Sequence, residues 1–457
     1  MRRSTSQMYL TAIAAFGLLV LGAAIAPANA QNNNFNTVPV PRVLEPQGWG
    51  PPATIGPNVD VSNENGPQSE TSVAVDPTNA KHLLYSVNDL NAPSGAGAVV
   101  WESTDGGATF SSFNQNASDF CYDTWLGFNT NGDAFMSYEC FDQRIAYKKK
   151  GQNTWTSTTL TIAGGAPDRD MVTVDNAPNS PFKGSVYIGY DDNGTGNTPY
   201  VLYSRNGFGS WNRSAAIPAS NPTIGVNVAT GPDGSVYACW EDYSGQKIWV
   251  SKSSNGGATF GTAHVVTNFR LNTTGFFVFI PAQNSRGILP MPFSAAAQGG
   301  AHAGRLFISY ADQDPSGSNL NIYVRFSDDG GTTWSAETKI NDDTNHADHF
   351  HNAIAVLATG LPGAVGVSFY DTRRDSSRVK TDRFFTYSTD GGVTWARNVR
   401  ITTAQSNETA SGSDFGNQYG DYQGMYADPG IGAHMSWTDS RNPGSNHEDL
   451  FAGSVHQ

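Results

Sequence analysis

Arginines and carboxylates recur together where short apolar segments of this chain begin and end. Acids follow apolar segments at Asp89 and Glu241, and arginines accompany acids in Arg169-Asp170, Asp371-Thr-Arg-Arg-Asp375 and Asp439-Ser-Arg441. A guanidinium binds a carboxylate through two parallel hydrogen bonds, and paired carboxyl groups can serve as acid and base. These residues therefore suit recognition of an acidic ligand or acid–base catalysis. The alternative is local, because Asp and Asn at strand ends commonly accept backbone N–H groups of turns.

Three histidines form a second group that could do chemistry. His346, His349 and His351 read His-x-x-His-x-His, and on a strand residues 349 and 351 face the same way. Such a pair suits metal coordination or proton transfer in a polysaccharide lyase, and ordinary loop histidines are the third interpretation. Acidic residues could also hold Ca²⁺ through oxygen ligands. Because the sequence has no dense Asp-x-Asp-x-Asp-Gly loop, we assign no metal ligand and no cofactor.

The elements that position these residues are indicated by a phrase that occurs four times. Its copies span residues 103–110 (Ser-Thr-Asp-Gly-Gly-Ala-Thr-Phe), 253–260, 327–334 and 388–395. The Asp or Asn can cap a turn, two glycines permit positive φ, and a Thr-aromatic pair starts the returning strand. Degenerate copies end at Trp155 and Trp211. Repetition at about the length of a four-stranded blade predicts a β-propeller.

The predicted number of blades is seven. Six blades are marked by these phrases, and three more strand segments follow at 424–427, 433–437 and 450–453. Residues 58–62 can supply a fourth strand and close the ring, which removes exposed sheet edges. Residues 276–304 read as an inserted loop. A six-bladed ring with an additional tail is the alternative.

The repeated phrase is the Asp-box, Ser-x-Asp-x-Gly-x-Thr-Trp, and the chain resembles the sialidase-type (BNR-repeat) β-propellers. The resemblance implies an all-β fold with Asp-box hairpins. Strands in a blade alternate in direction, so the starts of first strands and the ends of second strands share one face. The Asp-boxes lie on the other face. We expect the site on the first of these faces, at the mouth of the central channel, where several loops converge.

Sialidases hold the substrate carboxylate with three arginines and use a Tyr nucleophile, a Glu partner and an Asp acid. The resemblance implies Tyr422 as nucleophile, Glu241 as its partner and Asp89 as the acid. The substrate-binding residues follow from the same resemblance and from position on the channel face: they are Arg169, Arg373, Arg374, Arg441, Asp170, His349, His351, Asp421 and Asp371.

Residues 1–30 have the pattern of a secretory signal peptide. Arg2-Arg3 precedes an apolar stretch, and Ala28-Asn29-Ala30 is a small-x-small cleavage site. We expect a secreted or periplasmic protein in which residues 31–57 form an extended leader and residues 58–457 form one propeller domain. In that setting Cys121 and Cys140, which bracket the first two strands of the second blade, are placed to form a disulfide.

The leading functional hypothesis is a glycan-active exo-glycosidase that acts on an acidic sugar, with a glycan or glycoconjugate as partner. The net charge of −13 disfavours nucleic acid and anionic membranes as partners. Two alternatives stay open. The first is a non-catalytic propeller that binds carbohydrate or protein, and the second is a polysaccharide lyase.

Overall fold

The computed structural model describes residues 54–91, 95–115, 119–271, 277–357, 364–427, 432–442 and 448–456. The predicted signal peptide and most of the predicted leader lie outside these residues. The described residues belong to one compact unit, residues 37–457. No helix among them is long and apolar enough to cross a membrane.

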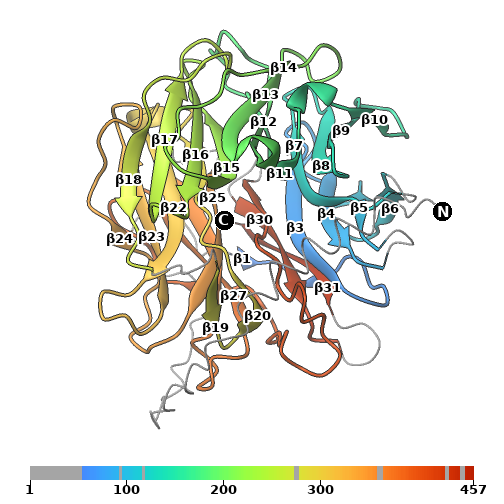
Figure 1. Cartoon of the computed structure of the whole chain (residues 1–457). Coiled ribbons are helices and arrows are strands. Elements are labelled where there is room, and N and C mark those ends of the chain that lie inside the picture. The colour runs from blue at the N-terminus through green and yellow to red at the C-terminus, as the bar shows by residue number, and fades with distance from the viewer. Residues whose placement is uncertain are drawn as a thin grey trace, which may run out of the picture. The chain divides into compact units, whose positions relative to one another are not determined.

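Seven antiparallel sheets form the blades of a β-propeller (Figure 1). The first strand of each blade lies next to the first strands of the two neighbouring blades, so that these strands form a closed inner ring. The predicted all-β fold and the count of seven blades are confirmed. The six-bladed alternative is wrong, because the last three strands form a seventh sheet with strands from the start of the described chain.

The strands fall into four positions from the centre outward. The first strands are β3 (Gln68–Val75), β7 (Tyr122–Phe128), β11 (Pro167–Val174), β15 (Thr223–Thr230), β21 (Phe293–Ala296), β25 (His349–Val356) and β29 (Met425–Ala427). The second strands are β4 (Leu83–Asp89), β8 (Ala134–Glu139), β12 (Val186–Asp192), β16 (Val236–Asp242), β22 (Leu306–Gln313), β26 (Val365–Asp371) and β30 (Gly432–Asp439). The third strands are β5 (Gly97–Ser103), β9 (Gln143–Lys148), β13 (Thr198–Ser204), β17 (Lys247–Ser253), β23 (Leu320–Ser327), β27 (Asp382–Ser388) and β31 (Asp449–His456).

The outermost strands are shorter. They are β6 (Ser111–Asn114), β10 (Thr156–Thr159), β14 (Asn212–Arg213), β18 (His264–Asn268), β24 (Thr338–Lys339) and β28 (Val399–Arg400). In the seventh blade β1 (Thr54–Ile55) and β2 (Val59–Asp60) both pair with β31, so strands from the beginning and the end of the described residues close the ring. Three 3₁₀ helices complete the described elements: η1 (Thr161–Ala163), η2 (Asn193–Thr195) and η3 (Gly300–His302).

The region predicted as an inserted loop is more ordered than the sequence suggested. Of residues 276–304, the structure describes 277–304, and they contain a hairpin, β19 (Val278–Ile280) and β20 (Gln283–Ile288), followed by β21. The prediction of one loop is therefore wrong. Only the hairpin is an insertion, and β21 is the inner strand of the fifth blade.

The repeated phrase forms the turn between the third and fourth strands. In the first copy the Asp105 carboxylate accepts the backbone N–H groups of Ala108 and Thr109 at 2.9 and 3.0 Å. The hydroxyl of Ser103 accepts the N–H of Gly107 at 2.8 Å, and Gly107 has a φ of 90°. Three backbone donors are thus satisfied by two side chains, which explains why the phrase recurs without reference to a ligand.

The inner strands are buried on both faces because neighbouring blades pack against each side. All eight residues of β3 are buried, although five of them, Gln68 to Ser72, are polar. Buried polar groups need partners, and here they link blades. Thr71 of the first blade donates to Gln423 at 3.0 Å, and Tyr370 of the sixth blade donates to the backbone oxygen of Thr438 at 2.8 Å.

Candidate functional site

Five inner strands carry a β-bulge at the same point, close to where the strand begins. In each, the pairing with the second strand shifts at one residue whose φ is positive. These residues are Glu70 (57°), Asp123 (54°), Arg169 (59°), Gly225 (66°) and His351 (44°). Non-glycine residues in this conformation are uncommon and cost on the order of 1 kcal/mol each. Bulges re-aim side chains, and these bulges bring Glu70, Asp123 and Arg169 into contact.

Arg169 is the centre of a buried ionic cluster. Its guanidinium lies 3.3 Å from Glu70 and 3.3 Å from Asp123, and it donates a closer hydrogen bond to Asp421. It is also 3.8 Å from Asp168. One arginine thus joins acids from the first, second, third and seventh blades.

A second arginine reaches the cluster from the inserted hairpin. Arg286 of β20 pairs with Asp421, and its Nη2 lies 3.9 Å from Glu70. The hairpin is held in place because Gln418 accepts the N–H of Arg286 at 3.0 Å and Gln283 donates to the oxygen of Gly420 at 2.8 Å.

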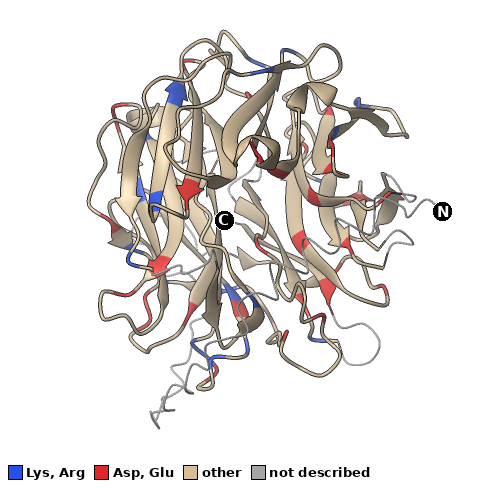
Figure 2. Ribbon diagram, in the orientation of Figure 1, with Lys and Arg blue, Asp and Glu red and all other residues tan. Residues whose placement is uncertain are grey.

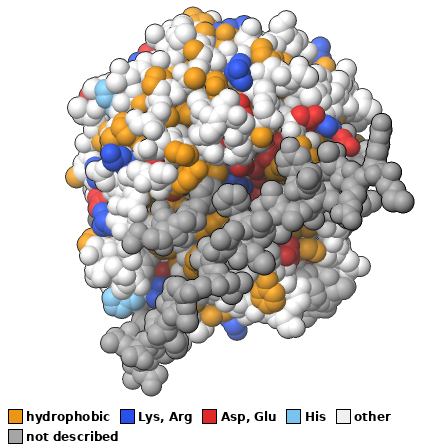
Figure 3. All heavy atoms as spheres, in the orientation of Figure 1, with side chains coloured by type: hydrophobic (Ala, Val, Ile, Leu, Met, Phe, Trp, Pro, Cys, Tyr) orange, Lys and Arg blue, Asp and Glu red, His pale blue; other side chains and the backbone are white. Residues whose placement is uncertain are grey.

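We call this group the channel cluster and define it by its charged residues. They are the carboxyl groups of Glu70, Asp123, Glu139, Asp168, Asp170, Asp191 and Asp421 and the guanidiniums of Arg169 and Arg286. Acidic residues are visible at strand ends facing the middle of the ring in Figure 2. Figure 3 shows acidic side chains in a recess near the middle of the same face.

The carboxyl groups of the cluster experience opposite environments. Burial, and then the charge of Asp123, raises the pKa of Glu70 well above its usual range. Burial would also raise the pKa of Asp421, but Arg169 and Arg286 outweigh it and hold that pKa below its ordinary value. Asp421 is therefore a stable anion, whereas Glu70 favours a proton or another counter-charge.

Half-buried aromatic side chains border the cluster. Tyr122 lies close enough to Glu139, Asp168 and Asp123 that these acids, after burial, raise the pKa of its phenol. Tyr243 has a pKa raised first by burial and then by Asp191 and Asp168. Asp168, with 29% of its side chain exposed, thus lies near both tyrosines. The accessible part of the cluster combines a carboxylate with two phenol rings.

The three residues predicted to be catalytic lie in different surroundings. Tyr422 is 2% exposed, and its hydroxyl donates to the backbone oxygen of Thr124 at 3.4 Å. Burial, and then the charges of Asp123 and Glu70, raise the pKa of its phenol well above the usual value, and Arg169 opposes this shift. Glu241 is fully buried, and burial followed by Asp242 raises its pKa to about 8.

Asp89 shows the local role of an acid that follows a second strand. Its carboxylate accepts the backbone N–H of Asn91 at 3.0 Å. Asp439 in the seventh blade accepts the N–H of Arg441 at 2.9 Å in the same way. Turn capping, the alternative weighed for these acids, describes both of them.

Of the predicted substrate-binding arginines, only Arg169 joins the channel cluster. Arg441 binds Asp439, Asn58 and Thr403 through all three guanidinium nitrogens. The Nε of Arg373 donates to Asp371 at 2.6 Å and its two Nη groups donate to Asp342 and Asn398, while Arg374 lies 3.4 Å from Asp382. Acceptors within their own and adjacent blades thus occupy the donors of Arg373 and Arg441, and a part for Arg373, Arg374 and Arg441 in substrate binding stays a prediction.

The two predicted histidines do not share an environment, because the bulge at His351 breaks the alternation of β25. His349 lies 2.9 Å from Asp343 and 3.2 Å from Asp371. Although burial opposes it, these two carboxylates raise the pKa of His349 to about 10. Within the described part of the chain His351 has no hydrogen-bond partner at either ring nitrogen, and burial lowers its pKa to about 3. One imidazole is thus a structural cation and the other a neutral ring.

Asp170, the last predicted residue, faces polar partners from the second blade. It accepts a hydrogen bond from Gln143 at 2.7 Å. Its other carboxylate oxygen is buried and has no hydrogen-bond partner among the described residues.

The sulfurs of Cys121 and Cys140 are bonded, and Cys239 is a buried free thiol. The bridge joins the residue before β7 to the residue after β8. It therefore holds together the strand ends that carry Asp123 and Glu139.

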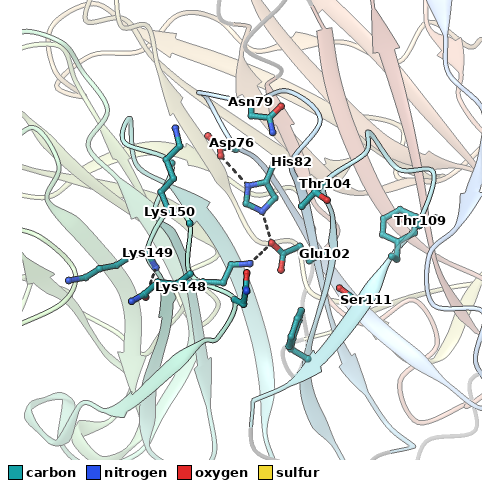
Figure 4. Close-up of a pocket in the computed structure, with 16 residues that line it drawn as sticks. Asp76, Asn79, His82, Glu102, Thr104, Thr109, Ser111, Lys148, Lys149 and Lys150 are labelled. Atoms are coloured by element: carbon teal, nitrogen blue, oxygen red, sulfur yellow. Dashed lines mark hydrogen bonds and ion pairs between the residues drawn. The ribbon is translucent and has the colours of Figure 1, made fainter.

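A separate hollow of ≈ 620 Å³ lies between the first two blades, beside the first repeated phrase. Its wall contains a chain of charges in which His82 contacts Asp76 at 3.1 Å and Glu102 at 2.7 Å, and Glu102 pairs with Lys148 (Figure 4). Burial opposes the charge on His82, but the two acids raise its pKa above the usual value. Each of these four charged side chains has a partner of opposite sign. We therefore assign this ionic network to the packing of two blades.

The sequence matches no family model and no curated protein. Among solved structures it is similar to YCF48 bound to a D1 peptide, at 12% identity over 91% of this chain and 98% of that chain, with a TM-score of 0.48. It is also similar to a leech intramolecular trans-sialidase complexed with 2,7-anhydro-Neu5Ac, at 11% identity over 76% and 70% of the two chains, with a TM-score of 0.48. A third is the NanB sialidase of Streptococcus pneumoniae, at 11% identity, 75% and 70% coverage and a TM-score of 0.47. The β-propeller fold of this chain is shown by its own strand pairings.

Proposed function

We propose that the protein is an exported carbohydrate-binding propeller that takes basic or uncharged sugars at the channel cluster. The observation that carries the proposal is the charge of that cluster, in which carboxyl groups outnumber guanidiniums and both guanidiniums are already paired. This choice departs from the leading sequence hypothesis, an exo-glycosidase of an acidic sugar.

The electrostatics disfavour an acidic ligand. A sugar carboxylate would need donors from Arg169 or Arg286, and both already donate to Asp421. It would also lie beside Asp168 and Asp123, which repel it. An amino sugar gains attraction from the same acids, and an uncharged sugar can donate its hydroxyl groups to them.

The border of the cluster supports a saccharide in particular. Tyr122 and Tyr243 place half-buried phenol rings near the partly exposed Asp168. Aromatic side chains combine a large apolar face with a polar end, which suits the alternating C–H and O–H surface of a sugar. Pockets of this kind need only a few placed polar groups for orientation.

Binding without hydrolysis is the simpler assignment. The predicted nucleophile Tyr422 is buried and engages a backbone carbonyl. A sialidase-type reaction also needs free arginines, whereas Arg373 and Arg441 are occupied. Export is part of the proposal because residues 1–30 have a signal-peptide pattern. Detection of the mature chain outside the cytoplasm would support it.

Calorimetric titration with three trisaccharides tests the proposal. The probes are chitosan trisaccharide (basic), its fully N-acetylated counterpart (uncharged, same backbone) and sialyllactose (acidic). We expect the basic probe to bind most tightly and the acidic probe least, with no release of reducing sugar and no absorbance at ~235 nm from an unsaturated lyase product. Preference for sialyllactose, or turnover of any probe, would overturn the proposal.

Variants locate the binding. Tyr243→Ala should weaken binding of the basic probe by about tenfold, as loss of an aromatic anchor does. Tyr203→Ala is the matched control, because Tyr203 is another half-buried tyrosine, on β13, and should leave affinity unchanged. Equal effects of the two variants would place the site elsewhere.

A further inference from the structure

Three carboxylates of the channel cluster meet where the second and third blades adjoin. Asp123 and Glu139 come from β7 and β8, and Asp168 comes from β11. One oxygen from each lies within 4.8 Å of the others. We propose that these three residues form a Ca²⁺ site that ties the two blades together, and that Asp168 belongs both to this site and to the proposed sugar site.

A buried carboxylate oxygen of Glu139 supports the binding of a cation at this point. Glu139 is 1% exposed, and its Oε2 has no hydrogen-bond partner among the residues that the structure describes. Leaving a buried carboxylate oxygen unsatisfied is costly, and native structures rarely do so without an ion or water. The local charge also favours a bound cation, because Asp123, Asp168 and Asp170 lie close to Glu139.

Arg169 does not neutralise this group by itself. It lies 3.3 Å from Asp123 and 3.8 Å from Asp168, but it is shared with Glu70 and Asp421. A divalent cation placed between Asp123, Glu139 and Asp168 would supply the remaining positive charge.

The ligand set selects the kind of metal. All three donors are carboxylate oxygens, which hard cations prefer. Ca²⁺ binds oxygens at about 2.3–2.6 Å, so two oxygens on opposite sides of the ion are separated by roughly 5 Å, and separations up to 4.8 Å fit between them. Water can complete the shell on the side where Asp168 is partly exposed.

The disulfide is placed to organise this site. Cys121 lies two residues before Asp123, and Cys140 directly follows Glu139. The bridge therefore holds two like-charged ligands close together before the ion arrives. This reduces the ordering cost of binding.

A comparable trio elsewhere in the fold provides the control. Asp343, His349 and Asp371 also bring their ligand atoms within 4.8 Å. There the imidazole is itself the cation, because the two acids, against the effect of burial, raise its pKa to about 10. Arg373 contributes a second positive charge beside Asp371. That group is already neutralised and should not bind Ca²⁺.

The test uses the whole exported chain, stripped with EDTA and then titrated with CaCl₂. We expect the thermal midpoint to rise by a few degrees at about 1 mM Ca²⁺, the affinity range of extracellular sites. Terbium luminescence excited through Tyr122 should appear on adding Tb³⁺ and should be displaced by Ca²⁺.

Glu139→Gln should lower Tb³⁺ affinity by about tenfold or more and abolish the Ca²⁺-dependent rise, while Asp343→Asn keeps both. Asp168→Asn, at a partly exposed position, gives the same readout if Glu139→Gln does not fold. Absence of a Ca²⁺ response in the wild type, or its persistence in both ligand variants, overturns the inference. Sugar titrations in EDTA report separately on the proposed function, so either idea can fail alone.

Discussion

Replacing Arg169 with Met should destabilise the propeller by about 3–5 kcal/mol, the usual result of removing one partner of a buried ion pair. The side chain is 8% exposed and contacts Glu70 and Asp123 at 3.3 Å in addition to Asp421. Met retains much of the volume, so the loss reflects charge and hydrogen bonds rather than a cavity. Asp421 would keep only Arg286 as its cationic partner.

Urea unfolding followed by tryptophan fluorescence measures this change, with the free energy obtained by linear extrapolation. EDTA is present throughout, so that a bound cation cannot alter the comparison. Arg213→Met is the matched control, because Arg213 is 33% exposed and lies 4.0 Å from Asp192. Although Asp192 is buried, the pair is long and Arg213 is partly exposed, so we expect its loss to cost about 0–1 kcal/mol. An Arg169→Met protein no less stable than Arg213→Met would refute the view that Arg169 holds the cluster together.

The buried acids Glu408 and Glu448 should make the protein sensitive to alkali: burial raises their pKa values to about 7 and about 11, and the charge of Glu408 adds to the second shift. A carboxyl group with a raised pKa stabilises the fold only while it holds its proton, so the stability that these two acids contribute is full below about pH 4.5 and declines as pH rises through about 7. Glu448→Gln should therefore show a smaller fall in thermal midpoint from pH 5 to pH 8 than the wild type. An equal fall in the two proteins would contradict this prediction. Replacing Cys121 and Cys140 with Ser should lower the free energy of unfolding by roughly 3 kcal/mol and reduce the rise in thermal midpoint that Ca²⁺ causes. If calorimetry shows an unchanged rise, the disulfide does not organise the ion site. Asp390→Ala should lower stability by about 1 kcal/mol and leave sugar affinity alone, so a loss of binding at an unchanged thermal midpoint would contradict a purely structural role.

Much of the fold could be predicted because its signals are local and repeated. The Ser-Asp-Gly-Gly-Thr phrase marks one turn in each of several blades. The hydrogen bonds of its Ser and Asp side chains join residues at most four positions apart, such as Thr109 and Asp105. The closing strand could also be inferred, because three strands at the end lacked a fourth. Neither feature depends on how the side chains of neighbouring blades pack against each other.

The site was harder to predict because bulges and an insertion determine it. Regular alternation put His349 and His351 on one face, but the positive φ of His351 separates their surroundings. Arg286 was missed because it lies in a region read as a loop. Glu139 and Asp123 stood at recognisable strand ends, yet only the structure shows that their oxygens converge with that of Asp168.

The arginines illustrate the same limit. Arg373 and Arg441 lie at the ends of second strands, as expected, but position along a strand does not reveal which acceptors are near. Asp371 and Asp439, two residues earlier in each case, accept the Nε donor of the arginine. A short spacing between Asp and Arg after a strand is therefore better read as a turn with its own ion pair.

The most direct test of the central claim is a crystal structure with the basic chitosan trisaccharide bound. The account predicts that a sugar amine or hydroxyl lies within hydrogen-bond distance of the Asp168 carboxylate, with sugar rings against Tyr122 and Tyr243. It would be contradicted by a sugar bound away from the channel cluster, or by sialyllactose bound with its carboxylate on Arg169 and Arg286.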